Sequence, residues 1–171
     1  MKNPETIIQQ LVTKYKLQPH PEGGFYKETY RSKGSIPKAA LSDGFAGDRN
    51  FSTAIYFLLT AGNFSAFHRI QQDEVWHFYD GEPLEVHVID TEGNYHCQEL
   101  HNDLESAGIP QFTVPAGCWF ASCVKGGGSY SFVGCTVAPG FDFADFELAK
   151  RESLANEYPQ YKTIIHQLTR S

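Results

Sequence analysis

Two side chains that can do acid–base or metal chemistry, His68 and Glu74, stand close together in one β-like stretch of the sequence. Side chains on a strand alternate between its two faces, so His68 shares a face with Ile70, and Glu74 shares one with Trp76 and Phe78. An imidazole facing a carboxylate in an aromatic-lined cavity can hold a metal with added water. Without a metal, it can act as a base with its orienting partner. The alternative is a hydrogen-bonded polar pair that only stabilises the core.

The segment around these residues resembles the first signature of the cupin superfamily, G-x5-H-x-H-x3-E-x6-G. It runs from Gly62 to Gly81, with Ile70 where the second histidine belongs. The stretch from Gly108 to Phe120 is similar to the second signature, with one extra residue before the proline and Phe120 in the histidine position. In cupins these histidines and the glutamate hold a divalent metal inside a small barrel. The resemblance therefore implies a barrel that lacks two of four ligands, and we expect neither a metal nor another cofactor in it.

Four segments together resemble one branch of that superfamily, the small bacterial, fungal and plant proteins catalogued as a domain of unknown function. They are Leu17 to Ser32, His68 to Gly81, Thr113 to Trp119 and Val137 to Glu147. The resemblance implies a double-stranded β-helix, the cupin jelly-roll barrel, and usually a homodimer. The fold is similar to that of plant storage proteins and of dTDP-4-keto-sugar epimerases. The resemblance carries over no reaction.

The sequence pattern independently predicts a β-rich domain with helices at both ends. Asn3 and Pro4 can begin a helix whose apolar residues recur at helical spacing up to Tyr15. After the breaker from Pro19 to Gly24, residues 25–31 alternate like a strand, and residues 32–50 read as a mobile loop. Eight short β-like runs follow, favouring a sandwich or jelly roll: 52–60, 64–70, 74–79, 84–89, 95–100, 111–114, 119–123 and 129–137.

Beyond Pro139 and Gly140 the pattern becomes helical. Phe143, Phe146, Leu148, Ala149 and Leu154 fall in one helical segment, and a second segment follows after Pro159. The whole chain, 1–171, is expected to form a single cupin-like domain.

Further residues are candidates for ligand binding because of their chemistry or their expected place in the barrel. We expect four aromatic side chains to line it: Tyr56, Trp76, Phe78 and Trp119. Glu28 and Arg31 follow the Gly23-Gly24 pair, and their odd spacing predicts opposite faces of a strand. Each of the two residues can equally lie at the surface and serve only in an ion pair or hydrogen bond. A carboxylate or phosphate group needs a guanidinium, which Arg31 or Arg69 can supply at the mouth of the pocket.

His77 is a further candidate, since it lies three residues after Glu74. That spacing places it on the opposite face of a strand, where it would serve in packing or in a dimer contact. It can join a ligand site only if a β-bulge shifts the register.

Composition excludes several classes of function. The chain has 14 Lys and Arg against 20 Asp and Glu, a net charge of -6, with no basic cluster, so nucleic-acid binding is not expected. It shows no apolar run of the about 18 residues that a membrane span needs and no signal core, which predicts a cytoplasmic protein without a membrane partner.

The cysteines, which lack metal-site spacing, are interpreted as small buried hydrophobes: Cys97, Cys118, Cys123 and Cys135.

These observations leave three functional hypotheses. The first is a metal-independent isomerase or epimerase that binds a small molecule, such as a carbohydrate or sugar nucleotide, with His68 and Glu74 as its catalytic residues. The second is a non-catalytic ligand-binding or storage-like module, favoured by the missing ligands at Ile70 and Phe120. A metal-dependent cupin enzyme ranks third.

Overall fold

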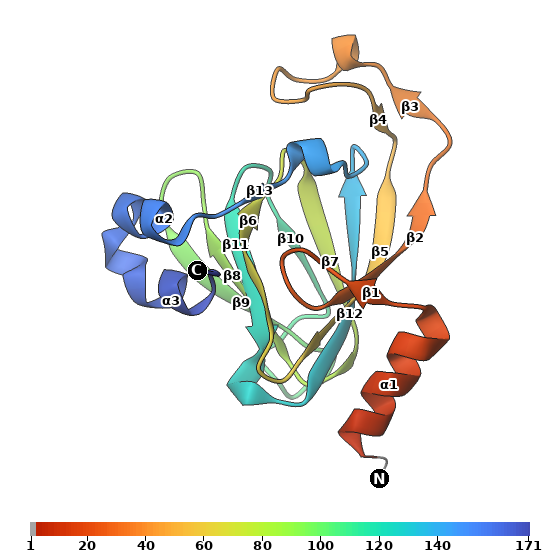
Figure 1. The fold of residues 1–171 in the computed structure, drawn as a ribbon, viewed down its shortest axis with the longest axis vertical. Helices are drawn as coiled ribbons and strands as arrows, with labels where there is room; N and C mark the ends of the chain where they lie inside the picture. The colour runs from red at the N-terminus through yellow and green to blue at the C-terminus, as the bar shows by residue number, and fades with distance from the viewer. Residues whose placement is uncertain (1–2) are drawn as a thin grey trace.

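Two antiparallel sheets face each other across an apolar interior in a computed structural model that describes residues 3–171 (Figure 1). The six-stranded sheet has the order β1-β2-β5-β12-β7-β10 and the five-stranded sheet the order β13-β6-β11-β8-β9. The first sheet contains β1 (Gln18–Pro19), β2 (Phe25–Arg31), β5 (Thr53–Thr60), β12 (Tyr130–Ala138), β7 (Asp73–Gly81) and β10 (Gln111–Val114). The second contains β13 (Glu147–Leu148), β6 (Phe64–Arg69), β11 (Trp119–Val124), β8 (Leu84–Ile89) and β9 (Tyr95–Leu100). The predicted jelly-roll barrel is confirmed.

Each of the eight predicted β-like runs corresponds to one strand, and no end differs by more than two residues. Alternate side chains of these strands fill the interior, where Phe57, Trp76 and Val86 are almost completely buried. This inward-facing core holds the two sheets together, since burial of apolar surface is the main favourable contribution to folding.

Helices cover the outer faces of both sheets. The predicted N-terminal helix is α1 (Pro4–Tyr15), and the Asn3 side chain accepts a hydrogen bond of 3.1 Å from the backbone N–H of Glu5 at its start. Its apolar face packs on the outside of the six-stranded sheet. The C-terminal helices α2 (Arg151–Glu157) and α3 (Lys162–Gln167) pack on the five-stranded sheet. Within residues 3–171, no helix is long and apolar enough to span a membrane.

The first predicted C-terminal helix begins later than expected. Residues Phe143–Asp145 form a short 3-10 helix, η3, and Glu147–Leu148 form β13. This strand adds to the edge of β6, where Leu148 pairs with His68. The free backbone groups of that edge therefore outweigh the local helical pattern. The remaining short helical turns are η2 (Lys125–Gly127) and η4 (Pro159–Tyr161).

The segment predicted as a mobile loop forms an arm that projects beyond the barrel (Figure 1). It contains β3 (Ser35–Ile36), the turn η1 (Lys38–Ala40) and β4 (Arg49–Asn50), and β3 pairs with β4. Arg49 anchors the arm because its Nε and Nη2 donate hydrogen bonds of 2.6 and 2.5 Å to the buried carboxylate of Asp145. A long-range ion pair of this kind was not visible in the sequence pattern.

Candidate functional site

A cavity of about 430 Å³ opens between the inner wall of the barrel and the segments on either side of its mouth. Strands β5, β6, β7 and β12 provide the wall, and residues from the β1–β2 region and from 141–146 complete it. Six polar side chains matter for its chemistry: His20, Glu22, Glu28, Arg31, His68 and Glu74. The structure thus places both predicted catalytic residues in one cavity.

His68 lies on β6, is only 3% exposed and has a polar partner at each ring nitrogen. Its Nδ1 is 2.7 Å from the carbonyl oxygen of Ala66, which can only accept, so Nδ1 carries a proton. Its Nε2 is 3.0 Å from Oε2 of Glu22. At this distance the two groups can stand as an imidazolium beside a carboxylate or as a neutral imidazole beside a carboxyl group.

Burial favours the neutral form of this pair. Loss of solvation raises the pKa of Glu22 above its ordinary value and lowers the pKa of His68 below its own. The nearby Glu74 opposes the second shift because its negative charge favours imidazolium. Burial therefore favours the protonated form of Glu22 and the neutral form of His68, and both groups lie at the cavity wall, where they can exchange protons with a ligand.

The turn between β1 and β2 holds Glu22 in place. Ser65 on β6 donates a hydrogen bond of 2.7 Å to Oε1 of Glu22, and Nδ1 of His20 lies 3.8 Å from Oε2. Glu22 and His20 are functional candidates that sequence reasoning missed, because the Pro- and Gly-rich stretch was interpreted only as a chain breaker. The sequence did contain a sign of a functional site, because a histidine and a glutamate lie within that turn.

Glu74, on β7, is 8% exposed and faces the same cavity. Burial raises its pKa to about 7, and the charge of Glu22 adds to this. Proximity to His68 and a hydrogen bond from the thiol of Cys135 act in the opposite direction. A carboxyl group with a pKa near neutrality can both accept and donate a proton at physiological pH.

Glu28 and Arg31 lie together at the cavity rim, contrary to the opposite faces that their odd spacing predicted. Nε and Nη2 of Arg31 donate hydrogen bonds of 3.0 and 2.7 Å to the two carboxylate oxygens of Glu28. The register of β2 against β5 shifts between Glu28 and Tyr30, so one residue is bulged out of the alternation. The prediction of opposite faces was wrong because it assumed a regular strand.

Two of the four aromatic residues expected to line the barrel lie outside it. Trp76 and Phe78 belong to the interior core beneath the cavity. Tyr56 instead packs against α1, and Trp119 packs under the C-terminal helices. The prediction failed for these two because the outer faces of both sheets are also apolar and covered.

His77 and Arg69 also lie away from the cavity. His77 is on the opposite face of β7 from Glu74, with Nε2 3.1 Å from Oγ1 of Thr136. Arg69 forms an ion pair of 2.7 Å with Glu147, and its guanidinium stacks on the Trp119 ring at 4.4 Å. Arg31 is thus the arginine, of the two considered, that reaches the cavity mouth.

The sequence matches the family model described as Cupin superfamily (DUF985) over residues 9–149. The chain belongs to this DUF985 family. Among solved structures, protein SO0799 of Shewanella oneidensis shares 39% identity with a TM-score of 0.84, covering 99% of each chain. A hypothetical protein from Leishmania major shares 34% identity with a TM-score of 0.85, covering 95% of this chain and 98% of that one.

A relative among curated proteins carries no assigned activity in its name. The uncharacterized protein YML079W of Saccharomyces cerevisiae is 29% identical over an alignment of 161 residues, and the match covers 89% of this chain and 80% of that protein. The DUF985 relationship therefore establishes family and fold, and the chemistry of the cavity has to be argued from its own residues.

The metal-binding residues of other cupins are not all present in the cavity of this DUF985 protein. Ile70 and Phe120, in the positions of two metal-binding histidines, are both buried, and the Phe120 ring packs 4.1 Å from the His68 imidazole. His68 already has a polar protein partner at each nitrogen. Within residues 3–171, no three His, Cys, Asp or Glu donor atoms of the cavity lie within 4.8 Å of one another.

Proposed function

We propose that the cavity binds a small polar organic molecule and that the protein is a metal-independent isomerase or epimerase acting on a carbohydrate or sugar-nucleotide-like ligand. One observation carries this proposal. The His68–Glu22 pair, with Nε2 and Oε2 3.0 Å apart, and Glu74, whose pKa is about 7, face the same cavity. Perturbed titratable groups that converge in a cavity are characteristic of acid–base catalysis.

The proposed reaction needs a base and an acid. Epimerisation beside a carbonyl begins when a base removes the proton from the adjacent carbon, while an acid protonates the carbonyl oxygen to give an enol. Ionised Glu74 is suited to remove the carbon-bound proton, and the His68–Glu22 pair carries the proton that the oxygen receives. The carbon then takes a proton from solvent on its opposite face, the enol oxygen returns its proton to the His68–Glu22 pair, and Glu74 releases to solvent the proton that it removed. These transfers invert the carbon and restore both groups.

The size and rim of the cavity agree with such a ligand. A volume of about 430 Å³ lies within the range of about 300–1,000 Å³ typical of small-molecule sites. Lys27 and Arg31 stand among its lining residues and provide cationic groups for an anionic substituent such as a phosphate. Glu28 neutralises part of the Arg31 charge, which limits this attraction.

Deuterium exchange tests the proposed function. The protein is incubated in D2O with a 4-keto nucleotide sugar, and deuterium at the carbon beside the carbonyl is measured by mass spectrometry. We expect incorporation by the wild type and its loss in Glu74→Gln. Glu22→Gln should slow exchange strongly while keeping the fold, because its amide can still bond Ser65 and His68 without acting as an acid.

His77→Gln is the matched control, since His77 lies on the same strand but outside the barrel. Its exchange rate should equal that of the wild type. A wild type that binds keto sugars without exchanging the carbon-bound proton would contradict the enzymatic proposal.

The second candidate is a non-catalytic binding module of the same cavity. It is favoured by Ile70 and Phe120, which replace two polar groups of related sites with apolar ones. Native mass spectrometry of protein isolated from its own host would identify a co-purified ligand. A ligand without an enolisable proton would favour this module over the isomerase.

We also infer that the protein works in the cytoplasm. All four of its cysteines are free, and stable free thiols are typical of a reducing compartment. Cell fractionation with a marker for each compartment tests this, and recovery outside the cytoplasmic fraction would contradict it.

A further inference from the structure

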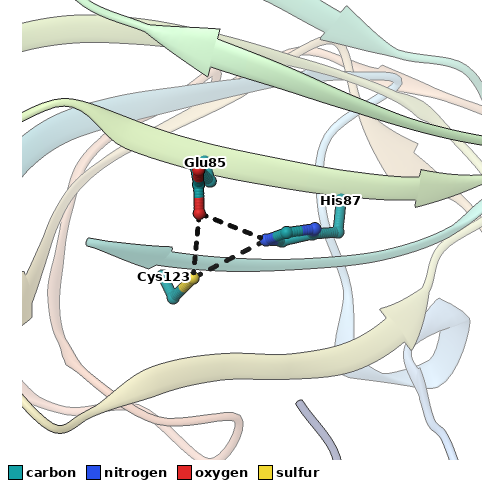
Figure 2. A group of neighbouring side chains, drawn as sticks. All are labelled: Glu85, His87 and Cys123. Atoms are coloured by element: carbon teal, nitrogen blue, oxygen red, sulfur yellow. Dashed lines mark hydrogen bonds and ion pairs between the residues drawn. The ribbon is translucent and has the colours of Figure 1, made fainter. Parts of the chain in front are cut away.

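Three side chains that can bind metal converge on the outer face of the five-stranded sheet, away from the cavity. Glu85 and His87 lie on β8 and Cys123 on the adjacent β11, where Cys123 is the direct partner of Glu85. Figure 2 shows the three side chains pointing toward one another from these two strands. Their ligand atoms all lie within 4.8 Å of one another.

The separations lie within about 0.4 Å of those in a tetrahedral zinc site. Sγ of Cys123 is 3.6 Å from Nε2 of His87 and 3.9 Å from Oε2 of Glu85, and the last two atoms are 3.8 Å apart. Ligand atoms on tetrahedral zinc lie about 3.4–3.6 Å apart, given bonds of about 2.3 Å to sulfur and about 2.0–2.2 Å to nitrogen or oxygen. We propose that Glu85, His87 and Cys123 bind a zinc ion on the outside of the barrel.

A second layer of contacts prepares His87 for this role. Its Nδ1 is 2.8 Å from the hydroxyl of Tyr95, which leaves Nε2 facing the other two ligands. Burial lowers the pKa of His87 to about 4, so the imidazole is neutral at physiological pH, as a metal ligand must be. Zinc-binding histidines are commonly oriented by a hydrogen bond at the second nitrogen.

Cys123 is a thiol in the metal-free protein, because burial raises its pKa to about 11. Zinc binding therefore exchanges the thiol proton for the metal: one S–H bond breaks, one zinc–sulfur bond forms, and one proton leaves to solvent. The thiolate and the Glu85 carboxylate together balance the two positive charges of the ion. This balance suits a partly buried site, where an uncompensated charge is costly.

Cys97 lies beside the three proposed ligands, outside the group whose donor atoms are all within 4.8 Å of one another. It is the direct partner of His87 in the pairing of β8 with β9, so the two side chains lie on the same sheet face. Cys97 is exposed and carries a free thiol. The fourth ligand is Cys97 or water, and a Cys97→Ser variant separates the two.

Metal titration of the full chain tests the site. Protein stripped with a chelator and reduced is titrated with Zn2+ against a chromophoric competitor, and then with Co2+. We expect one ion per chain, release of a proton on binding, and the intense sulfur-to-cobalt charge-transfer band of a thiolate ligand. Elemental analysis that finds no bound zinc at any excess would overturn the proposal.

Single substitutions locate the bound ion. Cys123→Ser and His87→Gln should each abolish stoichiometric binding, and Cys123→Ser should also remove the charge-transfer band. Tyr95→Phe should weaken binding on the order of 10-fold, as loss of an orienting partner does. Circular dichroism and thermal melting verify that each variant remains folded.

Two controls separate this site from other locations. His96→Gln changes a neighbouring exposed histidine of β9 and should bind zinc like the wild type. His68→Asn alters the cavity and should also leave binding unchanged. If His68→Asn loses the ion while Cys123→Ser keeps it, the metal lies in the barrel and the proposal fails.

Discussion

At the scale of single residues, the cavity is built from acids buried where they are hard to ionise. Glu22 and Glu74 are both nearly inaccessible to solvent, and burial raises the pKa of each. A side chain selected only for stability would not place an ionisable group there, because desolvation of a carboxylate costs free energy. Buried acids that destabilise the fold are typical of functional sites.

This cost predicts that Glu74→Gln is more stable than the wild type at alkaline pH. The pKa of Glu74 rises from 4.5 to about 7 on folding, so the native carboxyl retains a proton that the unfolded chain loses. Wild-type stability therefore falls as pH rises through this window, by up to about 3 kcal/mol at about 1.36 kcal/mol per pKa unit. Glutamine has no carboxyl proton to lose, so the stability of the Glu74→Gln variant does not fall with pH at this position.

Urea unfolding at pH 5 and pH 8 measures the effect. The advantage of Glu74→Gln should appear at pH 8 and shrink at pH 5. Glu147→Gln, which changes an exposed carboxylate at the protein surface, should alter stability little at either pH. Parallel pH profiles for the wild type and Glu74→Gln would contradict a raised pKa at this site.

At the scale of elements, sequence periodicity located each strand of four or more residues, but it missed the two-residue strands and did not separate the inner face from the outer face. Alternation distinguishes two faces only when one is polar. Here helices cover both outer faces, so Tyr56 and Trp119 look as apolar in sequence as the interior Trp76 and Phe78. Strand existence was therefore predictable, and cavity lining was only partly so.

The remaining differences arise from contacts between distant segments. Glu22 reaches His68 because the turn before β2 packs against β6, and Arg49 anchors the arm through Asp145, 96 residues away. A bulge in β2, invisible to a two-residue period, brings Glu28 and Arg31 together. Such long-range pairings are set by the whole fold, and no local pattern encodes them.

The turn that carries Glu22 predicts a sensitive position at Gly23. Its backbone has φ of +118°, and a Cβ atom there would lie 2.0 Å from the backbone oxygen of Phe64. Gly23→Ala should therefore move the β1–β2 turn away from β6 and separate Glu22 from His68. We expect a lower melting temperature together with loss of ligand binding or turnover.

Gly62→Ala is the matched control because Gly62 also has a positive φ, +74°, but nothing lies within 4 Å of an added Cβ. It should cost only the backbone strain of about 1–2 kcal/mol and leave the cavity intact. Equal loss of binding in both variants would show that general destabilisation, and not displacement of Glu22, is responsible.

At the scale of the whole molecule, the covered faces contrast with the projecting arm. Helices pack on the outside of both sheets, whereas Tyr30 on β2 and Phe51 beside β4 are 54% and 56% exposed. Large exposed aromatic side chains beside a short two-stranded sheet with open edges are suited to be covered by a second copy of the same chain. A closed two-fold contact is the commonest way for such a surface to be buried.

We therefore predict a homodimer at micromolar concentration, with the arm in its interface. Sedimentation velocity should give twice the chain mass of 19.2 kDa, and the double variant Tyr30→Ser, Phe51→Ser should shift the population to monomer. Leu104→Ser removes an equally apolar, fully exposed residue from a loop elsewhere and should leave the dimer intact. A monomeric wild type would contradict the dimer, and a dimeric double variant would place the interface on another surface.

If the dimer forms through the arm, Arg49 and Asp145 link it to segment 141–146 at the cavity mouth, so dissociation should also weaken ligand binding.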